Sequence, residues 1–238
     1  MKLDILAIGA HPDDTELSCG GTILSHISQG LKVGILDLTG GELGTRGTIE
    51  TRREEAANAA QILGVAVREN AGFADGFFVN DKEHQLALIS YIRKYQPDII
   101  LAPAIHDRHP DHARAAQLIE DAAFLSGLAK VETKLNGELQ QAFRPKAVYH
   151  YIQALDVKPD FAVDISAFFD KKLEAVRAYR TQFYDPKSKE PNTFISSPEF
   201  LNFVIGRGSH YGVPLGVKYA EAYTTKNPIG VSNLKNIF

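Results

Sequence analysis

The sequence predicts an α/β protein with a Rossmann-like, mostly parallel sheet and helices on both faces. Short apolar runs alternate with longer amphipathic stretches through the first half of the chain, which is typical of βαβ units. The first apolar runs are nearly continuous, as expected of strands buried on both sides. The length of 238 residues fits one domain. We divide it into a core over 1–140 and a small C-terminal elaboration over 141–238.

The elements of the first half are expected in strict alternation. The predicted strands and helices cover 3–9, 14–29, 32–38, 49–63, 65–73, 82–95, 98–102 and 111–125. Thr48 is the expected N-cap and Gly64 the expected C-cap of the helix between them, and Gly30 is expected to close the first helix. Right-handed crossovers would place the loops that follow the strands along one edge of the sheet.

The alternation changes after residue 140. Strands are expected over 147–152, 161–165 and 219–223, with a helix over 166–179 and another starting at Phe200. The stretch between Tyr184 and Pro198 contains three prolines and two lysines, which indicates a loop.

Composition excludes several classes of function. A net charge of −3 provides no basic surface for nucleic acid. No apolar run reaches membrane-spanning length, and the chain opens on a strand pattern rather than a secretory signal, so we expect a cytoplasmic protein. Cys19 is the single cysteine, which rules out an internal disulfide, and we interpret it as a buried thiol.

Two similar clusters contain most of the functional information. Residues 11–14 read His-Pro-Asp-Asp and residues 109–112 read His-Pro-Asp-His, and each cluster follows an apolar run that predicts a buried strand. The carboxyl end of a strand is where α/β folds place their chemistry. If the two strands are neighbours, the clusters face each other across a crevice.

A purely structural interpretation exists for each cluster. Asp13 or Asp14 could be the N-cap of a helix, as could Asp111, and the histidines could belong to a polar surface loop. However, three His and two Asp fall within the seven residues 106–112, directly after a buried strand. Clustered imidazoles and carboxylates are candidate metal ligands, and we favour that interpretation.

A catalytic zinc takes three protein ligands and leaves one position for water. The spacing of His11 and Asp14 allows one turn to offer two ligands, and His112 would supply the third from the facing loop. Asp13 would then lie near the open position, where it can accept a proton from water. His109 is expected on the other side of that position.

Asp111 has the position expected of a residue that holds an imidazole in one tautomer.

These motifs resemble those of the PIG-L/LmbE-like family of zinc-dependent N-acetylglucosamine deacetylases. The resemblance includes the Arg-Arg-Glu-Glu-Ala stretch at 52–56 and the ending at 216–223. Within the family the chain looks most like the branch of bacillithiol biosynthesis, which deacetylates N-acetylglucosaminyl malate. The resemblance implies the same ligands, Asp13 as general base, and a protonated His109 oriented by Asp111 beside the reacting carbonyl.

The resemblance also implies residues that bind the substrate. Arg52 matches a family arginine that grips substrate, and Glu42 and Asp75 match loop positions that hold sugar hydroxyls. The carboxylates of a malyl group call for a cation, and Arg108 lies in a candidate loop. Phe200 occupies the place of a tyrosine that faces the acyl oxygen in some relatives, so the metal and His109 would share the oxyanion.

The expected function is therefore hydrolysis of an acetamide on a small sugar, without nucleic acid or membrane as partner. We expect one divalent metal per chain, with zinc favoured and Fe(II) as an alternative, and a homo-oligomer, trimeric or hexameric, as in the family. Deacetylation of another N-acetylglucosamine conjugate and a metal-dependent phosphoesterase are the alternatives. A dinucleotide oxidoreductase is disfavoured, because the turn at 9–13 lacks the G-x-G-x-x-G pattern.

Overall fold

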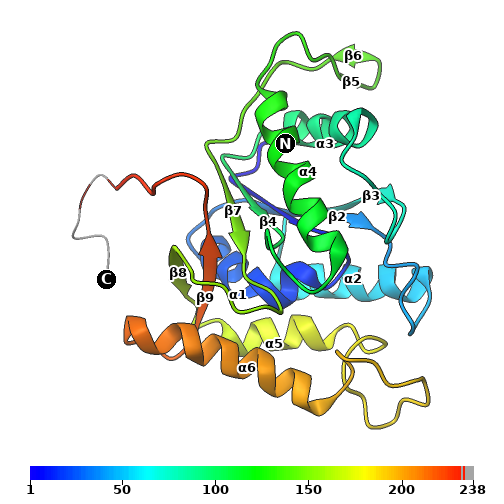
Figure 1. Cartoon of the computed structure of the whole chain (residues 1–238), viewed down its shortest axis with the longest axis vertical. Helices are drawn as coiled ribbons and strands as arrows, with labels where there is room; N and C mark the ends of the chain where they lie inside the picture. Colours follow the sequence, from blue (N-terminus) through cyan, green and yellow to red (C-terminus); the bar gives the residue numbers. More distant parts are fainter. Residues whose placement is uncertain (232, 234–238) are drawn as a thin grey trace.

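The computed structural model describes residues 1–231 and 233 (Figure 1). Within them, seven strands form one sheet in the order β3-β2-β1-β4-β7-β9-β8. The neighbours from β3 to β7 run parallel, whereas β9 is antiparallel to both β7 and β8. The strands are β1 (Ile5–Gly9), β2 (Val33–Thr39), β3 (Val67–Phe73), β4 (Ile99–Ala102), β7 (Ala147–Tyr151), β8 (Phe161–Asp164) and β9 (Ala220–Thr224). The predicted fold class is confirmed.

Helices cover both faces of this sheet (Figure 1). One face carries α3 and α4, which pack against each other, and the other carries α1, α2 and α5. The last helix, α6, packs against β9. The helices are α1 (Asp14–Ser28), α2 (Ile49–Leu63), α3 (Lys82–Tyr95), α4 (Pro110–Ser126), α5 (Phe169–Arg177) and α6 (Pro198–Gly212).

The composition of β1 explains why both faces must be covered. Leu6 and Ile8 pack into the apolar cluster beneath α3 and α4, whereas Ile5 and Ala7 pack into the cluster on the α1 side. All are buried. Burying an aliphatic side chain of this size stabilises the fold by about 1.5–3 kcal/mol, so a continuously apolar strand favours the centre of a sheet.

The order of the strands positions the functional residues. Strand β1 lies between β2 and β4, and its residue Ile5 pairs with Val33 on one side and Ile99 on the other. The chain therefore leaves β1 towards one side of the sheet and later returns on the other side. Loops diverge at such a switch point and leave a crevice at the carboxyl ends of the strands.

The later half of the chain completes this sheet. Strands β7, β9 and β8 extend it beyond β4, so these later strands are built into the same sheet as the strands of the segment 1–140. A two-stranded hairpin, β5 (Lys134–Leu135) and β6 (Glu138–Leu139), and a short 3₁₀ helix at Val213–Leu215 complete the secondary structure of the described residues. Within residues 1–231 and 233, we find no helix with the length and apolar character needed to cross a bilayer.

Several boundaries differ from the prediction for local reasons. Helix α6 begins at Pro198 rather than at residue 200, because the Ser197 hydroxyl accepts the N–H of Phe200 at 3.2 Å and forms the N-cap. Helix α5 is shorter than predicted at both ends. Helices α2 and α3 have the predicted bounds, with Thr48 and Gly64 as the caps of α2. The cap of α1 is Gln29, and Gly30 follows it with φ 87°.

Candidate active site

The turn after β1 has an unusual backbone. Asp13 occupies the N-cap position of α1 with φ 122°, and its side chain makes no capping hydrogen bond. Few residues other than glycine adopt such a conformation. The carboxylate of Asp14 accepts the backbone N–H of His11 at 2.9 Å rather than an N–H of the helix. Asp13 is thus the N-cap residue by position, but neither carboxylate accepts a capping hydrogen bond from the helix.

The loop after β4 is a conventional helix start. His109 is the N-cap of α4, and its Nδ1 accepts the N–H of Asp111 at 3.3 Å. Pro110 occupies the first helical position, where no N–H is required. This start places the side chain of His112 in the first turn of the helix, facing the turn after β1.

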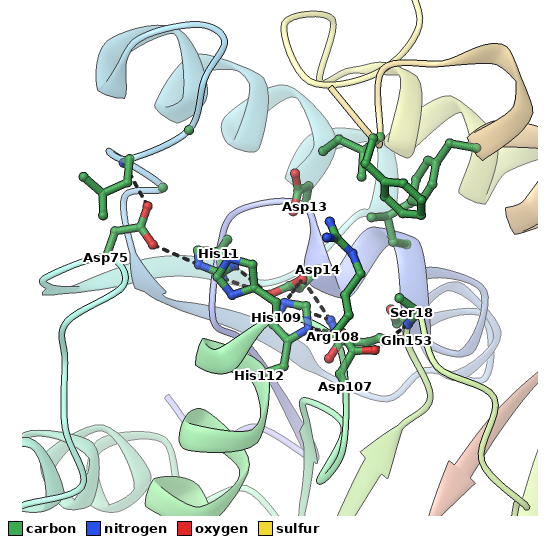
Figure 2. Close-up of a pocket in the computed structure, with 18 of the residues that line it drawn as sticks. His11, Asp13, Asp14, Ser18, Asp75, Asp107, Arg108, His109, His112 and Gln153 are labelled. Atoms are coloured by element: carbon green, nitrogen blue, oxygen red, sulfur yellow. Dashed lines mark hydrogen bonds and ion pairs between the residues drawn. The ribbon is translucent and has the colours of Figure 1, made fainter. Parts of the chain in front are cut away.

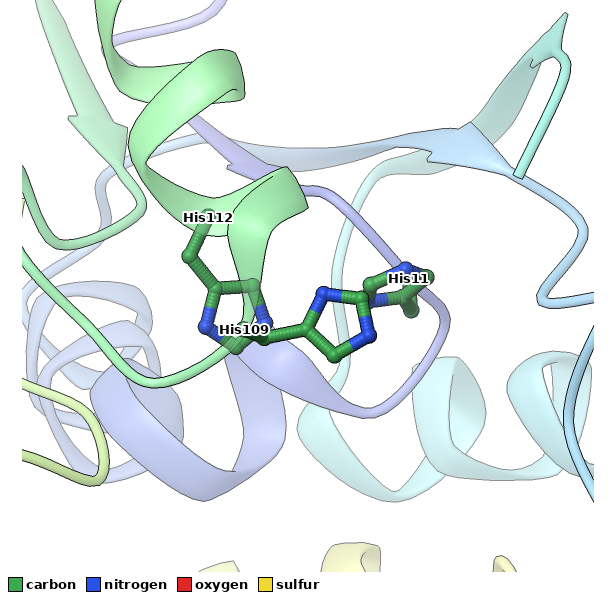
Figure 3. A group of neighbouring side chains, drawn as sticks. All are labelled: His11, His109 and His112. Atoms are coloured by element: carbon green, nitrogen blue, oxygen red, sulfur yellow. The ribbon is translucent and has the colours of Figure 1, made fainter. Parts of the chain in front are cut away.

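The two turns converge on one point. Figure 3 shows three imidazoles side by side, with ring centroids 4.7 Å apart for His11 and His109, and 5.7 Å apart for His11 and His112. Asp14 lies between the two outer rings, with its oxygens 3.6 Å from His11 Nδ1 and 3.1 Å from His112 Nε2. Two donors on a tetrahedral zinc, each about 2.1 Å from the metal, lie about 3.4 Å apart. The two imidazoles face different oxygens of the Asp14 carboxylate, Oδ2 for His11 and Oδ1 for His112. One ring nitrogen from each of His11, His109 and His112 also lies within 4.8 Å of the other two, so this cluster of imidazoles with Asp14 beside it could hold a divalent cation.

Carboxylates fix the orientation of His11. Its Nε2 lies 3.0 Å from Asp75 Oδ1 and 3.3 Å from Asp111 Oδ2, which leaves Nδ1 directed to Asp14 (Figure 2). Burial raises the pKa of Asp75, but hydrogen bonds from His11 and from the N–H of Leu43 outweigh it and lower that pKa to about 2. An ionised carboxylate on the far nitrogen is the usual support of a metal-ligating histidine.

His112 has a support of the same kind. Its Nδ1 lies 2.6 Å from Asp107 Oδ2, and Asp107 Oδ1 accepts the N–H groups of Ala154 and Leu155, both at 2.9 Å. Burial acts to raise the pKa of Asp107, but the hydrogen bonds hold it at about 2. Asp107 is one of the two aspartates in the cluster 106–112, and the sequence pattern gave no role for it. Nothing in the sequence indicated that the loop at 154–155 would lie next to Asp107.

Gln153 supports the third candidate ligand. Its Nε2 donates to Asp14 Oδ1 at 3.0 Å, and its Oε1 accepts the N–H of Ala104 at 3.0 Å. The amide is thereby held in one orientation between β4 and β7. Sequence reasoning missed this residue, because a lone glutamine after a strand has no distinguishing pattern.

Asp13 has the electrostatics of a base that works near neutral pH. Burial raises its pKa to about 7, although the Arg52 guanidinium, 3.8 Å away, acts in the opposite direction. The neighbouring carboxylate of Asp14 contributes to this rise in the same direction as burial. No hydrogen bond to the Asp13 carboxylate comes from the described part of the chain, so its oxygens are free to meet a ligand.

His109 differs from its expected state. Burial and the neighbouring His11 and His112 rings lower its pKa, which favours a neutral ring. Because Nδ1 accepts the N–H of Asp111, the ring proton is on Nε2. The expectation that the Asp111 carboxylate orients His109 is also wrong. That carboxylate contacts His11, Arg114 at 2.6 Å and the N–H of Gly76, and it is the backbone of Asp111 that orients His109.

These groups line a cavity of about 240 Å³ (Figure 2). One side is polar and comes from the turns after β1 and β4. The other side is apolar and consists of Leu17, Phe194, Ile195, Phe200 and Phe203. Among the described residues no tyrosine lines this cavity, which agrees with the expected loss of a phenol at position 200.

Two of the predicted substrate-binding residues contact protein groups instead. Arg52 lines the cavity, but it donates to the carbonyl of Pro12 at 3.1 Å and to the side chain of Gln182. Asp75 lines the cavity and holds His11 as described above. Both side chains thus contact protein groups, but the buried Nε of Arg52 has no hydrogen-bond partner among the described residues, and its role in substrate binding stays a prediction.

Glu42 is outside the cavity lining. It accepts the N–H of Asp75 at 2.8 Å and that of Gly40 at 3.1 Å, so it braces the loop that carries Asp75. Arg108 does line the cavity, where its guanidinium lies 4.4 Å from the ring centroid of Phe194. It is the predicted substrate-binding residue whose side chain lacks a polar partner within the described chain.

Comparisons with known proteins agree with this geometry. The model of the PIG-L family, described as GlcNAc-PI de-N-acetylase, matches residues 6–123. The diacetylchitobiose deacetylase of Thermococcus kodakarensis is 34% identical over 193 residues, covering 75% of this chain and 70% of that protein. The solved structure of a conserved protein from Thermus thermophilus aligns with a TM-score of 0.86, 39% identity and 98% coverage of each chain.

More distant relatives differ in their chemistry. A 4-oxalmesaconate hydratase of Pseudomonas putida is 28% identical, covering 74% of this chain and 73% of that protein. A probable N-acetyl-alpha-D-glucosaminyl L-malate deacetylase 2 of Bacillus cereus is also 28% identical, with 76% of this chain and 84% of that protein covered. With its fold, its paired motifs and these relatives, the chain belongs to the PIG-L family.

Proposed function

We propose that this protein is a metal-dependent hydrolase that removes the acetyl group from an N-acetylglucosaminide. The observation that carries the proposal is the convergence of His11, Asp14 and His112 in one cavity. The carboxylate of Asp13 lies beside them and accepts no hydrogen bond from the described residues. The similarity to a diacetylchitobiose deacetylase supports the reaction and the sugar.

The donor set defines how the metal would be held. His11 Nδ1, one oxygen of Asp14 and His112 Nε2 would bind one divalent cation per chain, and we propose zinc. Fe(II) accepts the same ligands. A cation bound there supplies Lewis acidity and lowers the pKa of water from 15.7 to about 7. Asp75, Asp107 and Gln153 keep the three ligands in place.

The catalytic steps follow from the remaining side chains. Asp13 takes a proton from the attacking water as the water oxygen bonds to the acetyl carbon. The Nε2–H of His109 donates to the carbonyl oxygen, on which negative charge develops. The C–N bond then breaks, and the proton held by Asp13 passes to the departing nitrogen. The products are acetate and a free amine. A general base and one oxyanion donor each contribute a factor of about 10²–10³ or more.

For the substrate we propose N-acetylglucosaminyl malate, as in bacillithiol biosynthesis. The motif resemblance and a relative named as an N-acetylglucosaminyl malate deacetylase support it. Arg108, which lacks an ion-pair partner within the described residues, would meet a malyl carboxylate. Another N-acetylglucosamine conjugate is the alternative. From the family resemblance we also propose a cytoplasmic homo-oligomer, trimeric or hexameric, which light scattering would test.

The experiment is a substrate panel on protein of known metal content. Acetate release is measured from N-acetylglucosaminyl malate, methyl N-acetylglucosaminide and diacetylchitobiose, and phosphate release from p-nitrophenyl phosphate. We expect acetate release that disappears with a chelator and returns with zinc or Fe(II). Acetate release from the methyl glycoside but not from N-acetylglucosaminyl malate would contradict the proposal that the malate conjugate is the substrate. Phosphate release without acetate release from metal-loaded protein would overturn the proposed deacetylase function.

A further inference from the structure

Three arginines line the cavity, and among the described residues only Arg52 has a carboxylate partner, Asp13 at 3.8 Å. Arg207, in the middle of α6, lines the same cavity and has no ion pair within residues 1–231 and 233. Sequence analysis did not single it out.

The Arg207 guanidinium is nevertheless fixed. It donates to the carbonyl of Leu17 at 2.8 Å and to the carbonyl of Gln153, and it lies 5.5 Å from the ring centroid of Phe203. A guanidinium has five N–H donors, so the rest remain without a partner in the part of the chain that the structure describes. Burial lowers the pKa of this group, although Tyr211, Glu221 and Asp107 act to raise it, and none of the three forms an ion pair or hydrogen bond with the guanidinium within the described residues.

Arg207 also lies where two cavities meet. A second cavity of about 320 Å³ adjoins the first, and the two share Gln153, Ala154, Phe203 and Arg207 as lining residues. A group attached to the sugar can therefore extend past Arg207 while the acetamide stays at the candidate metal ligands.

Arg207 is half-buried and has no carboxylate within hydrogen-bond distance among the described residues, so an anionic ligand would gain a charge-assisted hydrogen bond there. Backbone carbonyls that hold the guanidinium in one orientation prepare its planar fork for a carboxylate. The apolar surroundings strengthen the attraction. These properties describe a site for a carboxylate rather than for a neutral hydroxyl.

The position of Arg108 strengthens this interpretation. Phe200 lies 5.5 Å from Phe194 and 6.0 Å from Phe203, so the three rings form a row along one wall. Arg108 lies over Phe194 at one end of the row and Arg207 over Phe203 at the other. The wall thus presents two unpaired guanidinium groups.

We propose that Arg207 binds a carboxylate of the substrate's aglycone, so that the site selects N-acetylglucosaminides whose aglycone is anionic. This inference rests on the proposed deacetylase function and adds a second cation to Arg108. An aglycone with two carboxylates would have one guanidinium for each of them, Arg108 and Arg207.

The test compares two substrates in matched variants. Arg207→Gln should raise KM for N-acetylglucosaminyl malate about 10- to 100-fold more than KM for methyl N-acetylglucosaminide, because a hydrogen bond to a charged group is lost. Arg207→Lys keeps the charge without the fork and should give an intermediate value. Arg144→Gln is the control: Arg144 lies 4.3 Å from the Phe124 ring and donates to a backbone carbonyl, outside the cavity.

Equal changes in KM for both substrates would show that Arg207 has only a structural role, and would overturn the inference. A direct binding measurement separates this outcome from a failure of the proposed function. Calorimetric titration of free L-malate into the metal-loaded protein should give binding that Arg207→Gln weakens and Arg144→Gln preserves. Equal malate binding by all three proteins would also overturn it, even if none releases acetate.

Discussion

The turns after β1 and β4 have nearly the same sequence and opposite structural roles. In His-Pro-Asp-Asp the first residue, His11, is a candidate ligand and the third, Asp13, has a strained backbone and an unbonded carboxylate. In His-Pro-Asp-His the last residue, His112, is the candidate ligand, and the carboxylate of the third, Asp111, is fully buried against His11. The backbone around a motif therefore decides the role of each side chain.

The largest expected effect is at Asp13, the third residue of the first turn. Asp13→Asn should reduce kcat about 10³-fold, within the range measured for general bases, while the bound metal stays at one equivalent. Metal analysis beside steady-state kinetics checks both statements. Loss of the metal in this variant would mean that Asp13 is itself a ligand and that the role given to Asp14 is wrong.

The next effect tests the supports of the two imidazoles. Asp107→Asn should weaken metal binding about 10- to 100-fold, as at other sites where a carboxylate holds a ligand histidine. Competition with a chromophoric chelator measures the affinity without reference to activity. Glu120→Gln is the matched control, because Glu120 lies 2.9 Å from the buried His150 outside the site. Equal affinities for the two variants would contradict the role of Asp107.

A smaller effect concerns Arg52, which we now interpret as a partner of Asp13. Arg52→Lys should lower kcat about 10-fold, because Asp13 loses its positioned neighbour and shifts in the cavity. KM should change less than kcat. The opposite pattern, a higher KM for the malyl substrate at constant kcat, would restore the family-based role of Arg52 in substrate binding.

The smallest effect isolates the backbone strain at Asp13. Asp13→Gly and Asp13→Ala both remove the carboxylate, but only glycine accepts φ 122° freely, so the glycine variant should be more stable by about 1 kcal/mol. Urea unfolding of the two variants measures the difference. Gln96, with φ 45° at the end of α3, should show the same preference for glycine, and its variants should keep wild-type activity. An alanine variant at position 13 that is more stable than the glycine variant would show that the backbone there is not strained.

The sequence predicted the elements whose ends are chemically marked. Helix α2 has the predicted bounds because Thr48 and Gly64 cap it, and α3 because Asp81 caps its start. The hairpin of β5 and β6 was not predicted, although the pair Asn136-Gly137 between its strands is a recognised turn signal. Helix α5 has no side-chain cap, and its ends were placed least accurately.

The site was predictable where it depends on strand order. Because β1 and β4 are neighbours, two clusters about a hundred residues apart in sequence come together, and the expected proximity of His11 and His112 is confirmed. The contacts of Asp75, Gln153 and Arg207 depend on how loops and α6 fold over the sheet, which no local pattern records. Asp111 does hold an imidazole, as its spacing predicts, but that imidazole is His11 rather than His109, which sequence spacing does not distinguish.

The cavity draws its two sides from different parts of the chain. Every candidate metal ligand precedes residue 113, whereas the three phenylalanines and Arg207 come from α6 and the loop before it. Arg108 and Gln153 cross this division, since Arg108 lies over Phe194 from the first half and Gln153 holds Asp14 from the second. Reactivity and recognition can therefore diverge separately in evolution: replacements along α6 and the loop before it would retune which conjugates are accepted while the hydrolytic apparatus stays intact. Engineering a new preference would begin with libraries at positions 194, 203 and 207.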